Sequence, residues 1–302
     1  MAQAYPTKPV RLIVPFPAGG PADIFGRVLA QGMSTALGQP VVVENVSGVG
    51  GVLGVDRAAK SAPDGYTLVL NSSSSVSIAP FSMAKMPYDP GKDLTLITTV
   101  VRVPEVLAVN PVLPVNTLAE LIAYARANPG KVNFGSAGAG TITHLAGELL
   151  KVEANINLVH IPYKGAAPAV TDLLGGQVQM GVFDVPILLP HIRAGKLKAL
   201  AITSARRASS LPDVPTTGEL NYAKVNSDNW YGLVGPAGIP PAVLTRIHAA
   251  AVAALNAPEL IEQYSKVSGV PMPSSPDEYA VFIAAEQAKW GKVVKEIGFK
   301  AE

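Results

Sequence analysis

A glycine-rich segment near the start of the sequence has the residues of an anion-binding loop. Residues 16–23 read Phe-Pro-Ala-Gly-Gly-Pro-Ala-Asp, after an apolar run that predicts a strand at 10–16. Gly19 and Gly20 let the backbone approach a ligand closely, and Pro21 suits the first turn of a helix. The free amides and the dipole of that helix favour an anion. The alternative is an ordinary strand–helix turn, in which Asp23 caps the helix or orients the loop.

A second segment repeats this chemistry in the middle of the chain. Residues 135–141 read Gly-Ser-Ala-Gly-Ala-Gly-Thr, between an expected strand at 132–134 and an expected helix. Thr141 is placed to cap that helix, and His144 lies in its first turn. Ligands of open α/β sheets lie at the carboxyl ends of the strands. The two amide-rich junctions therefore predict two half-sites for one anionic ligand.

A carboxylate follows a third expected strand. Phe183 ends an apolar run at 178–183, and Asp184 follows it just before an expected helix. The Asp184 carboxylate has two alternative roles. It accepts a hydrogen bond from a ligand hydroxyl or amine, or from a water, or it caps the next helix.

Two further segments offer hydroxyl groups. Tyr163 follows a predicted strand at 156–161, and its neighbour Lys164 is interpreted as a solvated surface group. The run from Ser72 to Ser75 follows a predicted strand at 67–71. We interpret this run as a loop that presents hydroxyls and free amides to a ligand.

The spacing of these residues does not match the enzyme motifs that glycine-rich loops suggest. In residues 48–54, Gly-Val-Gly-Gly-Val-Leu-Gly, the third glycine falls one residue late for a dinucleotide fingerprint. Residues 135–141 lack the lysine of a P-loop, and Ser136 is outside a G-x-S-x-G elbow. A serine-type hydrolase using Ser136 and His144 stays as an alternative, with no third orienting group evident. The sequence favours a binding protein over an enzyme.

Composition excludes several other classes of protein. The 302 residues are 48% hydrophobic and 15% charged, which is too apolar for a disordered chain. The formal net charge of +2 comes without a clustered basic face, so we expect no nucleic-acid partner. Cysteine is absent, and the four histidines form no H-x-x-x-H pair. We therefore expect no metal site and no cofactor.

Alternating strand and helix patterns predict the α/β class with largely parallel sheets. The further predicted strands are at 40–46 and 197–202. Helices are predicted from about 21 to 37 and at 168–174, 187–194 and 240–255. Thr117 and Glu120 predict a capping box before one more helix. Ser275 and Glu278 predict another, at the start of a helix that runs to about residue 297.

The first residues favour secretion. Ala2-Gln3-Ala4 has the small-x-small form of a signal-peptidase site. We expect a mature N-terminus close to this point, with the signal peptide removed and Met1 added for expression. An ordinary polar N-terminus is the alternative.

Taken together, many short segments resemble the Bug family, the substrate receptors of tripartite tricarboxylate transporters. The matching segments, in chain order, are residues 16–20 with Asp23, 62–68, 135–141 with His144, Leu145 and Glu148, 160–165, 190–195, 211–216, 230–232 and 290–294. The resemblance covers essentially the whole chain in order, and the set is more specific than any one of its parts.

The resemblance implies a two-lobed periplasmic binding protein fold, a type II-like Venus flytrap with the ligand cleft between the lobes. Residues 1–104 and 226–302 would form lobe one, and residues 105–225 would form lobe two, with crossings near 101–108 and 221–228. Family members bind carboxylates mainly through backbone amides and waters. The expected ligand-binding residues are Phe16, Ala18, Gly19, Gly20, Pro21, Ala22, Asp23, Ser72, Ser73, Ser74, Ser136, Ala137, Gly138, Gly140, Thr141, His144, Tyr163, Phe183 and Asp184.

The implied function is capture of a small organic carboxylate in the periplasm and its delivery to membrane permease subunits. A C4–C6 dicarboxylate and an aromatic mono- or dicarboxylate such as terephthalate both fit. Val185 departs from the family pattern, in which a polar residue often follows the aspartate, and this favours a less polar ligand end. We expect a monomer without catalytic activity. A receptor that signals to a membrane sensor is the alternative within the same fold.

Overall fold

Three apolar strands form the centre of the first lobe in a computed structural model that describes residues 5–301. Strand β1 (Val10–Val14) pairs in parallel with both β2 (Val41–Asn45) and β3 (Thr67–Ser72). Most residues of β1 and β3 are buried, as expected for parallel strands that helices cover on both faces. Helix α1 (Pro21–Leu37) follows β1 directly, so the start of α1 lies at the carboxyl end of that strand.

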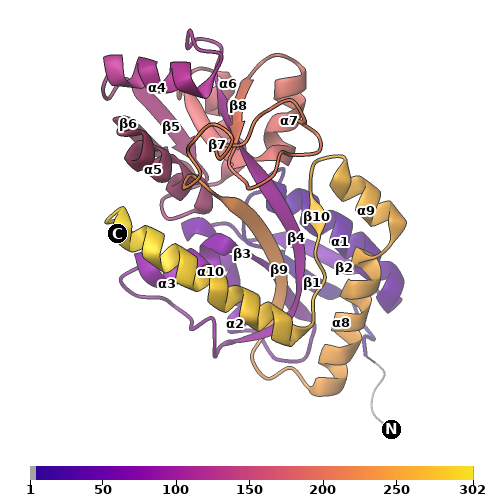
Figure 1. Cartoon of the computed structure of the whole chain (residues 1–302). Coiled ribbons are helices and arrows are strands. Elements are labelled where there is room, and N and C mark those ends of the chain that lie inside the picture. The colour runs from indigo at the N-terminus through magenta and orange to yellow at the C-terminus, as the bar shows by residue number, and fades with distance from the viewer. Residues whose placement is uncertain (1–4, 302) are drawn as a thin grey trace.

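Four strands form the sheet of the second lobe together with the end of a strand from the first. Strand β5 (Val132–Ser136) pairs in parallel with β6 (Leu158–Pro162) and β7 (Met180–Asp184). Strand β8 (Lys198–Ile202) completes this half of the sheet. The helices of this lobe are α4 (Leu118–Ala127), α5 (Ile142–Ala154), α6 (Ala166–Leu174) and α7 (Val185–Arg193). Figure 1 shows this lobe above the first one.

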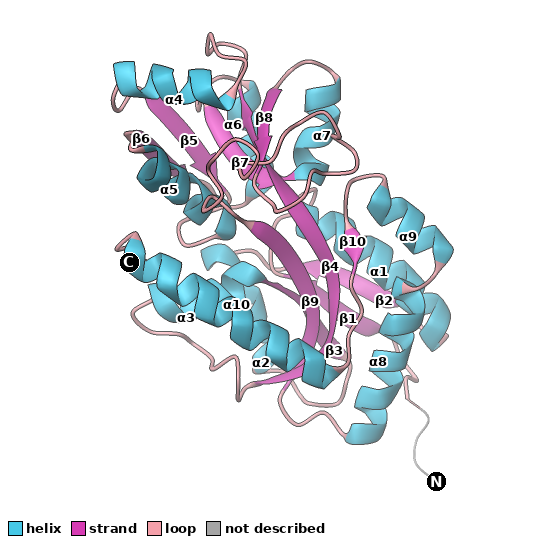
Figure 2. Ribbon diagram, viewed as in Figure 1, coloured by secondary structure: helices cyan, strands magenta, loops and turns pink. Residues whose placement is uncertain are grey.

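Two strands pass between the lobes. Strand β4 (Leu94–Val109) pairs with β9 (Asp228–Pro236) along residues 94–104, and then with β7 and β8 along residues 105–109. Strand β9 also pairs with β3. All of these contacts are antiparallel. One continuous sheet therefore runs through both lobes, as Figure 2 shows in magenta.

The C-terminal elements cover the sheet and connect both cores. Helices α8 (Pro241–Leu255) and α9 (Pro258–Ser265), with β10 (Val270–Pro271), pack on the first lobe. Helix α10 (Pro276–Glu296), yellow in Figure 1, spans the boundary. Tyr279 near its start is buried in the core of the first lobe, and Trp290 near its end is buried in the core of the second.

Most predicted elements are confirmed within a few residues. The Ser275–Glu278 capping box is present in full at the start of α10. At α4 the Thr117 hydroxyl accepts from the Glu120 amide, but the Glu120 carboxylate accepts from the Asn116 amide, so the predicted box is only half formed. Strands β4, β9 and β10 and helices α2 (Val52–Ala59) and α9 were not predicted.

The structure corrects two predictions. The sheet is mixed rather than largely parallel, because the strands that cross between lobes run antiparallel to their neighbours. The four-serine run is not a loop. It continues β3 into a buried π-helical turn (Ser74–Ile78) and the short helix α3 (Ala79–Ser82). The Ser75 hydroxyl bonds the backbone of Ser72, which satisfies polar groups that burial takes from water. The predicted cleavage site at Ala2-Gln3-Ala4 lies outside the described residues.

Across residues 5–301 we find no helix with both the length and the apolar character needed to cross a bilayer. The apolar residues instead pack into clusters on the two faces of the sheet in each lobe.

The close packing of α5 on β5 generates a test of the fold. A Cβ atom added at Gly147 would lie 2.3 Å from the Phe134 ring, so Gly147→Ala forces the helix away from the strand. We expect a loss of about 1–3 kcal/mol in the free energy of unfolding, measured by urea denaturation. Gly175→Ala is the matched control, because φ there is −78° and the nearest atom is 3.5 Å from the new Cβ. Equal stability of the two variants would contradict this packing.

Candidate functional site

A small cavity lies between the two lobes, where the carboxyl ends of several strands meet. The first lobe contributes residues around the start of α1, together with Ser74, Asn229 and Tyr231. The second contributes the starts of α5 and α6, and Asp184. The full lining is Phe16, Pro17, Gly20, Pro21, Ala22, Ser74, Ala137, Thr141, Ile142, Thr143, Ala166, Asp184, Asn229 and Tyr231. The free volume of this cavity is about 30 Å³, so the lobes are nearly closed over it.

The start of α1 forms one wall of the cavity. Gly20 is the N-cap residue, and no side chain hydrogen-bonds to the first amides of the helix. Pro21 occupies the first turn, where its missing N–H leaves no donor unsatisfied. This helix end therefore faces the cavity with its backbone dipole and its uncapped first turn.

Asp23 belongs to the support of this wall and not to its surface. Its carboxylate accepts hydrogen bonds from the Gly19 amide, Arg27 Nε and Asn45 Nδ2 at 2.9–3.0 Å. Burial opposes ionisation of this group, but the hydrogen bonds from Arg27, Gly19 and Asn45 outweigh it and lower the pKa of Asp23. Asp23 orients the loop, which was one of its two predicted roles.

The start of α5 forms the facing wall. Thr141 is the N-cap residue by backbone position, but its hydroxyl donates to the Gly138 carbonyl at 2.6 Å and leaves the helix amides uncapped. Thr143 Oγ1 accepts from the Ala137 amide at 2.8 Å, which shapes the loop before the helix. The Ile142 amide donates across the lobe boundary to Ser74 Oγ at 3.1 Å. A serine of the first lobe thus satisfies one amide of the second.

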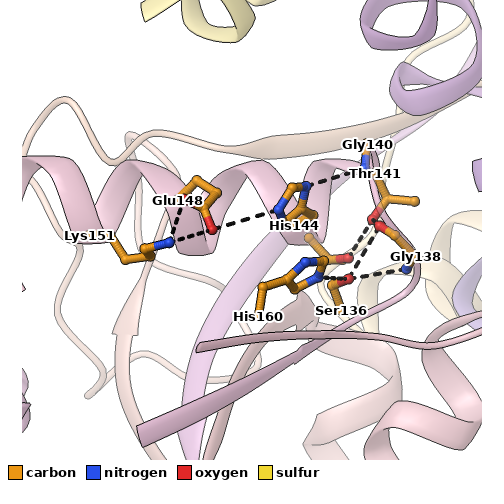
Figure 3. Close-up of polar contacts among 9 residues, drawn as sticks. Ser136, Gly138, Gly140, Thr141, His144, Glu148, Lys151 and His160 are labelled. Atoms are coloured by element: carbon orange, nitrogen blue, oxygen red, sulfur yellow. Dashed lines mark hydrogen bonds and ion pairs between the residues drawn. The ribbon is translucent and has the colours of Figure 1, made fainter. Parts of the chain in front are cut away.

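A network of polar contacts joins His144 and His160 to residues 136–141 before α5, as Figure 3 shows. Ser136 Oγ lies 2.6 Å from His160 Nε2, and the His160 ring stacks on His144 with 3.8 Å between centroids. His144 Nδ1 accepts from the Gly140 amide at 3.2 Å, and its Nε2 lies 3.7 Å from a carboxylate oxygen of Glu148. Burial, followed by the effect of His144, lowers the pKa of His160 to about 3. Neutral His160 therefore shares a hydrogen bond with the Ser136 hydroxyl, and the tautomer of the ring sets which of the two groups donates.

This geometry does not place Ser136 and His144 as a catalytic pair. The serine hydroxyl bonds His160, and neither Ser136 nor His144 lines the cavity. The sequence prediction missed His160 as the partner because 24 residues separate it from Ser136, and only the pairing of β5 with β6 brings them together.

The third wall is a chain of polar side chains at the crossing strands. Ser73 Oγ donates to Asn229 Oδ1 at 2.9 Å, which turns Asn229 Nδ2 toward both oxygens of Asp184 at 3.0 Å. Tyr231 Oη donates to Asp184 Oδ2 at 2.6 Å. Asp184 belongs to the second lobe and the other three residues to the first, so this chain crosses the boundary. Burial raises the pKa of Asp184 to about 6, although these donors oppose the shift.

A second buried carboxyl lies beside Asp184. Glu105 on β4 is directly opposite Asp184 on β7, and its side chain is fully buried. Neither of its carboxyl oxygens makes a hydrogen bond of normal geometry: the Ser227 hydroxyl lies near enough to favour the charged form of Glu105, but it donates to Thr203. Burial, and then repulsion by Asp184, raises the pKa of Glu105 well above its ordinary value. Glu105 was not predicted, because a single glutamate inside an apolar run resembles an exposed strand position.

The predicted site residues divide into three groups. Those that line the cavity are Phe16, Gly20, Pro21, Ala22, Ser74, Ala137, Thr141 and Asp184. Gly138 and Tyr163 line a wider outer groove that also includes residues 47–51 and 299–301. The Tyr163 hydroxyl is occupied there, because it donates to Asp172 at 2.7 Å. Ala18, Gly19, Asp23, Ser72, Ser73, Ser136, Gly140, His144 and Phe183 line neither space.

The lining residues that prediction missed are Pro17, Ile142, Thr143, Ala166, Asn229 and Tyr231. Asn229 carried little local signal, since it stands between Asp228 and Trp230 at the start of a strand that was not predicted. No group of three or more metal-ligating side chains occurs within residues 5–301.

The buried state of Glu105 generates a pH prediction. The pKa of Glu105 is raised in the folded protein, so the folded state binds this proton more tightly than the unfolded chain does. The stabilisation that results is complete below the unfolded pKa and is lost as pH rises through the folded pKa. We expect the free energy of unfolding to fall between about pH 5 and about pH 8 by at least about 1.4 kcal/mol more in the wild type than in Glu105→Gln. Urea denaturation at both pH values measures this difference. Glu296→Gln, at an exposed position, is the control, and parallel pH profiles for wild type and Glu105→Gln would contradict the buried state.

Comparison with proteins of known structure confirms the periplasmic binding protein fold. The periplasmic binding protein BugD matches with a TM-score of 0.95 and 34% identity, over 99% of this chain and 100% of that chain. An R. palustris protein with adipate matches with a TM-score of 0.95 and 32% identity, over 98% and 99% of the two chains. MatC from Rhodopseudomonas palustris, with bound malate, matches with a TM-score of 0.91 and 30% identity, over 96% and 100%.

Sequence comparison agrees. Protein BugT of Bordetella pertussis is 41% identical over 300 residues, which are 99% of this chain and 92% of BugT. Because these relatives are solute-binding proteins and Ser136 pairs with His160, the hydrolase hypothesis was wrong. The model of the tripartite tricarboxylate transporter family receptor matches residues 25–299, and the chain belongs to this receptor family.

Proposed function

We propose that this protein is a periplasmic receptor that captures a small organic carboxylate and delivers it to the permease of a tripartite tricarboxylate-type transporter. The observation that carries the proposal is the pair of helix starts, α1 and α5, which border one cavity from opposite lobes and are not capped by the side chains of their own N-cap residues; Ser74 bonds only the Ile142 amide of α5. Uncapped helix starts bind anions through backbone amides and the helix dipole. The lining contains no lysine, arginine or histidine that could take over this role.

The ligand class is inferred from the polarity of the cavity lining. Much of the lining is apolar, from Phe16 and Pro17 to Ile142 and Ala166. A C4–C6 dicarboxylate or a small aromatic carboxylate matches this mixture of amide-rich ends and apolar walls. Relatives with adipate and with malate support the dicarboxylate class. Because the free space is small, we expect the lobes to open further to admit such a ligand and then to close on it.

We propose lobe limits of 1–104 with 226–302 for lobe one and 105–225 for lobe two. The sheet supports this division, because β4 exchanges β9 for β7 and β8 as partners between Pro104 and Glu105. Closure would then form the cross-lobe bonds of Ser74 with Ile142 and of Asn229 with Asp184. Ligand contacts with both lobes exist only in the closed form, so binding shifts the population toward it. The permease would recognise the closed form of a monomer.

A screen of carboxylates tests the proposal. We expect at least one of succinate, adipate, malate, benzoate and terephthalate to raise the melting temperature of the purified protein and to bind in calorimetry. A folded protein that binds none of a broad panel of mono-, di- and tricarboxylates would contradict the proposal.

A paired substitution in the second loop tests the position of the site. Ala137 lines the cavity and is half-buried, whereas Ala139 in the same loop is exposed and lies outside the cavity. We expect Ala137→Leu to fill the cavity and to weaken binding of the best carboxylate at least about tenfold, which is about 1.4 kcal/mol. Ala139→Leu should leave the affinity within about threefold. Equal effects of the two variants, both folded by circular dichroism, would place the ligand elsewhere.

A further inference from the structure

Two buried carboxyl groups lie side by side where β4 passes from one lobe to the other, and anion capture by backbone amides uses neither of them. Glu105 and Asp184 are direct partners in the antiparallel register of β4 and β7. Side chains of directly opposed residues project from the same face of a sheet, with Cβ atoms roughly 4.5–5.5 Å apart. Glu105 is fully buried and Asp184 nearly so, and Asp184 also lines the cavity.

The surroundings of the pair are poor in positive charge. Asp184 on β7 and Asp228 on β9 repel a negative charge on Glu105, and Lys289 on α10 attracts one. Lys289 does not reach the pair as a salt-bridge partner, because its ammonium lies over the Trp290 ring, 4.8 Å from the centroid. Arg102 on β4 and Glu286 on α10 act on Asp228. The polar groups that favour the charged forms of the pair are neutral, namely Asn229 and the Tyr231 hydroxyl at Asp184 and the Ser227 hydroxyl near Glu105.

The two members of the pair are solvated very differently. Asp184 accepts three hydrogen bonds, whereas both oxygens of Glu105 lack a partner. Two carboxylates this close in a dry site are not ionised together, so the pair retains a proton. Hydrogen bonds favour the charged form of Asp184, and burial favours the neutral form of Glu105. Burial raises the pKa of both groups, of Asp184 to about 6, so they titrate as one unit rather than independently.

We propose that the protein captures its carboxylate together with one proton, which the Glu105–Asp184 pair takes up as the lobes close on the anion. This inference rests on the proposed function, since it concerns the same cavity. An anion held by the amides of α1 and α5 shares a very small space with Asp184, so a charged Asp184 repels it. Because Glu105 already holds the proton that the pair retains, the further proton from the solvent forms an O–H bond on the Asp184 carboxylate, and no bond of the ligand breaks.

The sign of the pH dependence follows from linkage. The bound state holds the proton more tightly than the free state, so affinity is highest below the pKa of the free pair. Affinity falls as pH rises through that pKa and reaches its minimum above the pKa of the bound pair. Because burial raises the pKa of Asp184 in the free protein to about 6, the fall should begin near there.

Isothermal titration calorimetry with adipate and with malate tests the inference. Titrations at about pH 6.5 and about pH 8.5 keep both probes fully ionised, and two buffers with different ionisation enthalpies report the protons exchanged. For a probe that binds, we expect uptake of up to about one proton and an affinity at least about tenfold weaker at the higher pH. Asp184→Asn, which replaces the carboxyl that accepts the proton, should abolish both the uptake and the pH dependence, whereas Glu105→Gln, which mimics the neutral glutamic acid and lies outside the cavity lining, should retain both. Glu296→Gln, at an exposed position, should retain both.

Each contrary outcome has a distinct meaning. Equal affinities at the two pH values with no proton uptake would overturn the inference and leave the proposed function intact. Affinity that increases with pH would indicate that Asp184 binds a cationic group of the ligand, and this result would also overturn the inference. Full proton uptake by a folded Asp184→Asn variant would assign the proton to another group and overturn the inference. Failure of adipate, malate and the wider carboxylate panel to bind at either pH would remove the proposed function itself.

Discussion

The backbone hydrogen bonding of β4 is the constraint on which the rest of the structure depends. This strand pairs with β9 through residue 104 and with β7 and β8 from residue 105, so a single extended segment belongs to both lobes. An unpaired buried backbone group is costly, and the lobes cannot separate at this point without breaking ladder bonds. Relative motion of the lobes is therefore confined to bending of the crossing strands and of the segments beside them.

The position of the cavity follows from this constraint. Strands β1, β5 and β7 all end near the crossing, and each is followed by a helix start, at Pro21, Ile142 and Val185. Backbone amides therefore converge on one small volume without any need for basic side chains. The cross-lobe bonds from Ser74 and Asn229 close the same volume. The tight contact of Gly165 with Pro17, where a Cβ would lie 2.7 Å from the proline ring, leaves the lobes little freedom to approach further.

Helix α10 gives the two lobes a second connection. Tyr279 donates a hydrogen bond to Asn71 in the first lobe, and Trp290 packs in the core of the second. Glu286 accepts from the indole nitrogens of both Trp230 and Trp290 and so joins the helix to β9. Any opening of the lobes must accommodate a helix that is anchored at both ends, which favours a small, defined motion over a wide one.

The amino-acid sequence by itself determined the α/β class, most strand and helix positions and the two anion-binding helix starts. Local rules are sufficient for these features, because apolar periodicity, glycines and capping residues act within a few positions. The sequence also identified eight of the cavity-lining residues, Asp184 among them, since these residues lie at or just after the ends of expected strands. Only the tertiary structure placed Asn229 and Tyr231 in the wall, paired Ser136 with His160, and brought Glu105 beside Asp184. Ser136 and His160 are 24 positions apart, and Glu105 and Asp184 are 79 positions apart, so strand pairing that no local pattern encodes brings them together. Burial rather than residue type then decides which of the two carboxyl groups keeps its proton.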